Sequence, residues 1–204
     1  GYLWRSDGTR AGTWRTALPS PGYSGIVTAV NDRVLVGAPQ LASPNRQSLL
    51  AWDGSGSFTT LQTQNGFWTG PTVAVFDGRA WIADPNLDAF ALVTDGTPGG
   101  TRVIPRTRYG SPLRVTTSLG VMGNSLWLFA GQQLFRVDPG VPDPVPVAAL
   151  PFDPAGAQFG PMIGARRLVV LPDRRLRLFD PSSWTVADLG LSVSGGGPIA
   201  FGEG

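Results

Sequence analysis

The residues of this sequence that could do chemistry are its Asp and aromatic side chains, because the usual reactive residue types are missing. The chain contains no His and no Cys, and its sixteen basic residues are all Arg. Without imidazole or thiolate groups, it cannot build a Ser-His-Asp triad, a Cys nucleophile or an ordinary zinc or copper site. Acid/base work is left to Asp, Tyr and Arg, since Glu203 is the single Glu. We therefore expect no cofactor.

Paired carboxylates are the next possibility, because glycosidases hold two of them at a defined separation in one pocket. The first β-prone run of each repeat, which is predicted to form an inner strand, carries no acid. Asp32 and Asp77 come after such runs, and Glu203 lies at the end of the sequence. Asp84 and Asp88 belong to a predicted hairpin loop, where they shape or solvate the chain. The sequence therefore favours a non-enzyme without catalytic residues over a five-bladed-propeller glycosidase.

Asp-Gly-Thr segments at Asp7 and Asp95 resemble calcium loops in composition. Calcium takes about six to eight oxygen ligands, and each segment supplies one carboxylate. Asp followed by Gly is a strong turn former, because Asp bonds its own backbone and Gly accepts positive φ. The sequence predicts turns here and no metal site.

Aromatic side chains recur in connections rich in Gly, Pro and Ser, just before the predicted first strand of each repeat. Ring faces there could stack on apolar patches of a sugar or a peptide, which makes them the predicted ligand-binding residues for a carbohydrate or protein partner. The alternative, which the sequence favours, is that they wedge between neighbouring sheets. These residues are Tyr23, Phe67, Trp68, Tyr109 and Phe159. The strand residues Trp4, Trp52, Trp81 and Trp127 are predicted to lie in the core.

A repeat of about forty residues positions these side chains. Five apolar-rich runs end in Asp7, Asp53, Asp95, Asp138 and Asp180, which are 46, 42, 43 and 42 positions apart. Gly or Pro follows each Asp, so each run is predicted to end in a hairpin turn and to be followed by a further strand. Two more β-prone runs precede the Asp run in most units, and the first of these is poor in bulky residues.

Units of this length with four strands are typical of a β-propeller, whose inner strands converge on a narrow axis. The predicted fold is all-β, with about five four-stranded antiparallel blades in one domain, residues 1–204, and no helix. The units cover residues 1–21 with 195–204, 22–66, 67–109, 110–152 and 153–194. The first unit combines both chain ends, so the terminal strands are expected to pair and close the ring; a fragment of a larger ring is the alternative.

Charge and hydropathy exclude two partner classes. The formal net charge is only +2 although the pI is near 9.7, because Asp residues are scattered among the Arg residues. Nucleic-acid binding needs a basic patch, and the sequence shows no such clustering beyond two short Arg groups. No window approaches the roughly twenty apolar residues of a membrane span.

Two segments resemble a known repeat. Leu3 to Thr13 and Phe90 to Thr101 are similar to the Leu-Trp-x-Ser/Thr-Asp-Gly-Thr-x-x-Gly-Thr repeat of bacterial secreted or surface proteins, although the second lacks the Trp. The resemblance implies a non-enzymatic β-propeller at the cell surface, in the periplasm or outside the cell, and it transfers no ligand. The predicted function is a binding or scaffolding module, lectin-like or protein-binding. The alternative is a structural subunit of a larger surface assembly.

Overall fold

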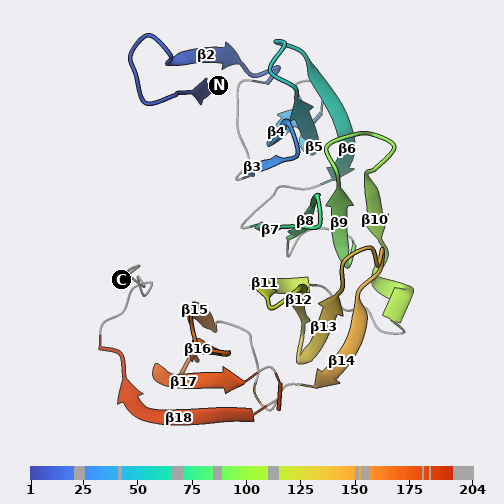
Figure 1. The fold of residues 1–204 in the computed structure, drawn as a ribbon. Coiled ribbons are helices and arrows are strands. Elements are labelled where there is room, and N and C mark those ends of the chain that lie inside the picture. Colours follow the sequence, from blue (N-terminus) through green and yellow to red (C-terminus); the bar gives the residue numbers. More distant parts are fainter. Residues whose placement is uncertain are drawn as a thin grey trace. The chain divides into compact units, whose positions relative to one another are not determined.

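The chain is all-β in a computed structural model (Figure 1). The structure describes residues 1–20, 26–40, 43–65, 71–84, 89–109, 115–149, 152, 157–180, 182–183 and 185–194. The sequence predicted no helix; the described part contains one, the single 3₁₀ turn η1 (Arg106–Tyr109). No helix in that part is long and apolar enough to cross a membrane.

The chain divides into two compact units, Gly1–Ser118 and Leu119–Gly204. The first unit holds one hairpin and two four-stranded sheets in simple sequential order. The hairpin is β1 (Tyr2–Arg5) and β2 (Trp14–Ala17); the sheets are β3 (Val27–Val30), β4 (Arg33–Gln40), β5 (Ser43–Trp52) and β6 (Phe58–Asn65), then β7 (Thr72–Phe76), β8 (Arg79–Ala83), β9 (Ala91–Thr94) and β10 (Arg102–Ile104).

The second unit holds most of two further four-stranded sheets, again in sequential order. They are β11 (Val115–Met122), β12 (Ser125–Ala130), β13 (Gln133–Val137) and β14 (Val145–Ala149), then β15 (Gln158–Ile163), β16 (Arg166–Val170), β17 (Arg175–Asp180) and β18 (Thr185–Ser192). The prediction of four-stranded antiparallel sheets is confirmed. The predicted closing segment, residues 195–204, lies outside the described residues.

Two-residue turns join the first two strands of each four-stranded sheet. Asn31 and Asp77 adopt positive φ of 52° and 50°, and Gly123 and Gly164 adopt 61° and 62° at the corresponding places. Asn, Asp and Gly tolerate this region, and such turns match the right-handed twist of the flanking strands. Local sequence therefore favours the turn between the first and second strands of each sheet. These turns are separate from the Asp turns, which join the third and fourth strands.

Each unit has its own apolar core, built from the buried faces of its central strands. In the first unit, Leu35, Leu49 and Ala51 of one sheet pack with Ile82 and Leu92 of the next. In the second unit the cluster includes Phe129, Leu134, Val169 and Phe179. Every one of these side chains is at most 1% exposed. Burial of apolar area on this scale is the main force that holds adjacent sheets together.

The tryptophan prediction is right for three residues and wrong for the fourth. Trp52, Trp81 and Trp127 are buried, whereas Trp4 is 62% exposed. Trp4 lies in the two-stranded sheet β1–β2, opposite Arg15, whose guanidinium lies 5.8 Å from the Trp4 ring and 4.2 Å from the Tyr2 ring. A strand position predicts that a side chain faces one side of a sheet, but burial needs a second layer on that side.

Candidate functional site

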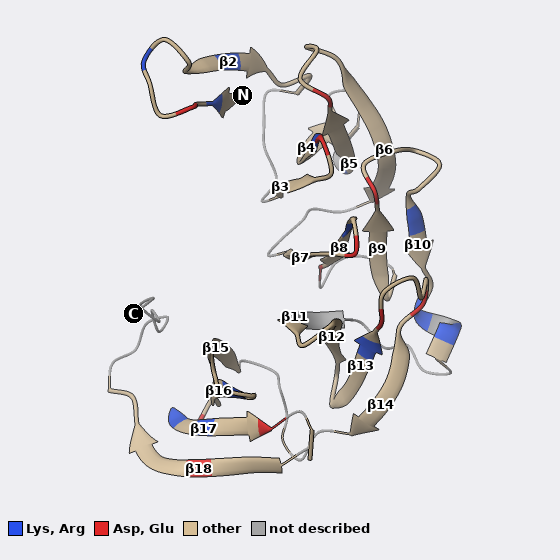
Figure 2. Cartoon of the chain, in the orientation of Figure 1, with Lys and Arg blue, Asp and Glu red and all other residues tan. Residues whose placement is uncertain are grey.

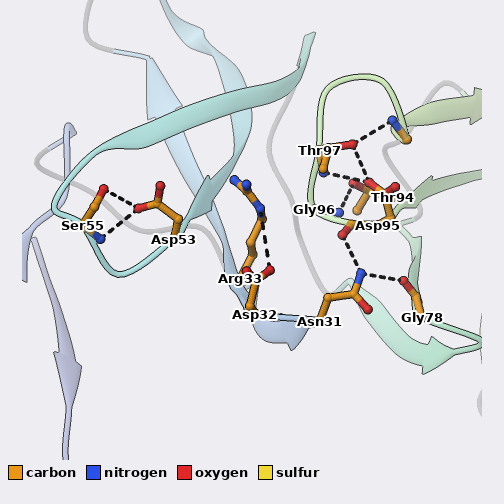
Figure 3. A network of polar contacts seen from close by, with 11 residues as sticks. Asn31, Asp32, Arg33, Asp53, Ser55, Gly78, Thr94, Asp95, Gly96 and Thr97 are labelled. Carbon is orange, nitrogen blue, oxygen red and sulfur yellow. Dashed lines mark hydrogen bonds and ion pairs between the residues drawn. The ribbon is translucent and has the colours of Figure 1, made fainter.

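The Asp-Gly-Thr turns at Asp7 and Asp95 are the segments whose composition resembles calcium loops. Oδ1 of Asp95 accepts hydrogen bonds from the Thr97 backbone N–H and hydroxyl, at 2.8 and 2.7 Å (Figure 3). The Thr97 hydroxyl accepts the Gly100 N–H at 3.0 Å, and the Thr94 and Thr101 hydroxyls lie 2.6 Å apart. The carboxylate is therefore used to close the turn.

The turn at Asp7 repeats this network atom for atom. Its Oδ1 accepts the Thr9 N–H and hydroxyl at 2.9 and 2.8 Å, Thr9 accepts the Gly12 N–H at 2.9 Å, and Ser6 takes the place of Thr94. Asp53 and Asp180 make the two-bond core of the motif with Ser55 and Ser182. These hydrogen bonds lower the pKa of all four Asp side chains.

The turns of neighbouring sheets in the first unit are tied together by one amide. Nδ2 of Asn31 donates to the backbone oxygens of Gly78 and Asp95, at 3.1 and 2.9 Å (Figure 3). Within the described residues, no three acidic side chains come together as metal ligands would. The Asn31 amide thus joins the first turn of one sheet to two turns of the next.

Charged residues of both signs are scattered over the described strands and turns (Figure 2). In sheet β15–β18 they form ion pairs: Arg166 with Asp180 at 3.4 Å, Arg175 with Asp188 at 3.3 Å, and Arg177 with Asp173. The Arg177 hydrogen bonds are the main cause that lowers the pKa of Asp173 from 3.8 to about 2.

Acid should lower the stability of sheet β15–β18, and Asp173→Asn should show how much of this loss comes from the Asp173 carboxylate. A carboxyl whose pKa is lower in the folded chain than in the unfolded chain stabilises the fold above the unfolded value of 3.8 and stops doing so as pH falls through about 2. Wild type should therefore melt at a higher temperature than the variant at pH 6, and the difference should shrink as pH falls from about 4 through 2. A difference that is constant across this range in thermal melts would contradict the assignment. Asp32→Asn, at an exposed carboxyl 3.9 Å from Arg33, is the control.

A groove of about 390 Å³ lies in the first unit beside one face of sheet β3–β6. Strand alternation sends Leu35, Leu49 and Ala51 to the opposite, core side, and the groove side carries both polar and apolar side chains. The register places Ala38 beside Ser48 and Leu50 beside Thr60 on the groove side. No lining residue is charged; the lining is Pro19, Ser20, Ala38, Pro39, Gln40, Ser48, Leu50, Phe58 and Thr60.

Neutral hydrogen-bonding groups are arranged on this face. Nε2 of Gln40 donates to the hydroxyls of Ser48 and Thr63 at 2.9 and 3.3 Å, and these hydroxyls lie 3.1 Å apart. The Ser20 hydroxyl, which is buried, has no hydrogen-bond partner in the described part of the chain. An unsatisfied buried hydroxyl costs about 1–3 kcal/mol.

Phe58 is the aromatic residue of the lining, and it belongs to a stack of aromatic rings. Phe58 stacks on Trp52 with ring centroids 6.3 Å apart and an interplanar angle of 25°. Trp52 in turn contacts Trp14 edge-on, at 5.2 Å. The contact with Trp52 therefore holds the Phe58 ring in place where it lines the groove. A fixed ring beside neutral polar groups suits a hydroxyl-rich ligand with an apolar face.

The two predicted aromatics that the structure describes contact core residues. The ring of Tyr109 lies 4.8 Å from that of buried Phe90, and Phe159 stacks on Phe129 at 5.2 Å. Neither lines the groove. Tyr23, Phe67 and Trp68 lie outside the described residues, so their role as ligand-binding residues stays a prediction. Sequence reasoning missed Gln40 and Ser48, because the strand faces that carry them are otherwise mostly apolar, as Ala38 and Leu50 show.

Comparison with known proteins identifies the fold and no family. No family model matches the chain, and no curated protein matches it. Among solved structures, AztD from Citrobacter koseri matches over 92% of this chain and 50% of its own, with 14% identity and a TM-score of 0.56. Apo AztD from the same organism gives 13% identity and a TM-score of 0.52 over the same shares.

The extracellular domain of the one-component system BT4673 from B. thetaiotaomicron is also similar. It matches over 92% of this chain and 26% of its own, with 12% identity and a TM-score of 0.51. The chain thus spans half or less of the length of these three solved structures. At these identities the likeness extends to a propeller-like arrangement of four-stranded sheets.

Proposed function

We propose that the chain is a non-catalytic, carbohydrate-binding propeller module that works outside the cytoplasm, and that its ligand occupies the groove beside sheet β3–β6. The observation that carries this proposal is the neutral polar lining of Gln40, Ser48 and the unpartnered Ser20 hydroxyl next to the held Phe58 ring. Sugars offer many hydroxyls and apolar ring faces, and they carry no charge that this lining would need to neutralise.

Location outside the cytoplasm rests on two supports. The Asp7 and Asp95 hairpins resemble the repeat of bacterial secreted or surface proteins, and their shared hydrogen-bond network gives that motif a physical basis. One solved structure that the chain resembles is named as an extracellular domain. Secretion can be tested by cell fractionation, and a cytoplasmic pool alone would refute this part of the proposal.

A glycan array tests the ligand class. Wild type should bind at least one group of related neutral glycans, and Gln40→Ala should reduce that signal about tenfold, since it removes hydrogen-bonding groups from the lining. Gln132→Ala, an exposed turn position, is the matched control and should bind like wild type. Trp68→Ala separately tests the predicted aromatic connection. Absence of any glycan signal with folded wild type would reject the proposal.

A scaffolding role is the second candidate, and the exposed face of the β1–β2 hairpin favours it. Tyr2 and Trp4 are 53% and 62% exposed, with the Arg15 guanidinium over both rings. Aromatic and Arg side chains are enriched where proteins contact one another. If no glycan binds, capture of a specific partner that Trp4→Ala abolishes would support this role instead.

Ring closure is the finer part of the fold proposal. The β1–β2 sheet has two strands where the other four sheets have four. Residues 195–204 contain the β-prone run Pro198-Ile199-Ala200-Phe201, which would supply a further strand to that sheet. We infer a ring of about five blades closed in this way, and deletion of Gly197 to Gly204 tests it.

A further inference from the structure

Arg167 in β16 differs from the Arg residues around it. Arg166, Arg175 and Arg177 each pair with an Asp, whereas Arg167 makes no ion pair or hydrogen bond in the described part of the chain. It is half-buried, and burial lowers the pKa of its guanidinium. A desolvated cation without a counter-ion is unfavourable, and charged groups at such positions are normally paired.

The side chain of Arg167 faces the space between the two sheets of the second unit. Its cross-strand neighbours are Met162 on β15 and Phe179 on β17, and Phe179 is fully buried in the core. Directly opposed residues share one face of a sheet. Nη1 of Arg167 lies 3.8 Å from where a Cβ on Gly120 of β11 would be, so the guanidinium reaches the first strand of the neighbouring sheet.

A groove of about 630 Å³ lies in the same unit, and Met162, the cross-strand neighbour of Arg167, is one of its lining residues. Met122, Trp127 and Met162 line it, and none of its lining residues is charged. The Trp127 indole N–H donates to the Met122 backbone oxygen at 3.3 Å, so its one polar atom is satisfied and its ring forms an apolar wall. Met122 and Met162 are the only two Met residues of the chain, and Met side chains adapt to ligands of varied shape.

We propose that this groove binds an organic carboxylate with an apolar tail, of the medium-chain fatty acid class. The carboxylate pairs with the Arg167 guanidinium, and the tail lies against Met122, Trp127 and Met162. Met162 connects the two parts, because it lines the groove and is the cross-strand neighbour of Arg167. Arg forms forked, charge-assisted hydrogen bonds with carboxylates, which supplies the counter-ion that Arg167 lacks.

The two Met residues provide a direct readout. Protein labelled with ¹³C at the Met methyl groups should give two methyl signals, and Met162→Leu assigns them by removing one. Titration with decanoate below its micelle concentration should shift both signals of wild type. Arg167→Gln should weaken decanoate binding about tenfold to a hundredfold, the usual effect of losing hydrogen bonds to a charged group. Arg166→Gln is the matched control, because Arg166 is exposed and paired with Asp180.

Decanol and acetate separate the tail from the head group. Decanol should bind more weakly than decanoate and be insensitive to Arg167→Gln, and acetate should shift neither Met signal at the same concentration. Arg167→Gln removes an unpaired charge, so it should melt at or above the wild-type temperature, and a loss of binding will not reflect unfolding. Unshifted Met signals with decanoate, or equal decanoate affinities of wild type and Arg167→Gln, would overturn the proposal.

Discussion

Gly100→Ala should destabilise the protein by about 1–3 kcal/mol, whereas Gly99→Ala, one residue earlier, should leave its stability unchanged or raise it slightly. A Cβ on Gly100 would clash with the Asp95 carboxylate, and a Cβ on Gly99 would meet nothing within 4 Å. The Asp95 carboxylate cannot retreat, because two hydrogen bonds from Thr97 hold it. Chemical unfolding of the two variants and wild type measures the difference.

A double mutant isolates the cause. In an Asp95→Ala background the obstructing carboxylate is gone, so Gly100→Ala should cost much less than it does in wild type. The two substitutions should thus show a coupling energy, as contacting residues do. If Gly100→Ala is equally harmful in both backgrounds, the close approach of Asp95 is not why this motif position carries Gly.

Deleting Gly197 to Gly204 should lower the melting temperature by roughly 10 °C or more. Under the closure proposal this segment adds a strand to the β1–β2 sheet and buries Ile199 and Phe201, at about 1.5–3 kcal/mol for each fully buried side chain. In a domain of this size, 1 kcal/mol corresponds to about 2–4 °C. Differential scanning calorimetry of the truncated and full-length chains gives the shift.

A shorter truncation and a point variant keep this test specific. Removing only Glu203 and Gly204 should have little effect, because the β-prone run stays intact. Ile199→Asp in the full-length chain should reproduce most of the loss, since it places a charge at a proposed buried position. A truncated chain that melts like wild type would show that the ring is not closed by this segment.

Local sequence predicted the strands well, because apolar runs and turn-forming Asp residues are both short-range signals. Apolar runs that end in Asp mark the third strand of each sheet, and the Asx turn at Asp95 forms from four polar groups within six residues of the chain. The two-residue turns at Asn31 and Asp77 could have been found in the same way, since Asp77-Gly78 is a strong hairpin signal.

Burial of a side chain and the position of the groove depend on contacts between sheets and on strand register, so the sequence did not predict them. Trp4 has the same strand context as Trp52, yet Trp52 is buried beneath Trp14 and Trp4 faces solvent. The groove depends on a register shift between Leu49 and Leu50, which sets the side chains of β6 that share a face with Ser48. A one-residue shift exchanges the two faces of a strand, and no composition signal reports it.

Titration calorimetry with the best-bound glycan measures whether the groove beside sheet β3–β6 is the ligand-binding site of this module. Wild type and Gln132→Ala should bind with the same Kd, and Gln40→Ala should bind about tenfold more weakly while melting within a few degrees of wild type. Equal affinities for all three proteins would place the ligand elsewhere and contradict the assignment of the groove.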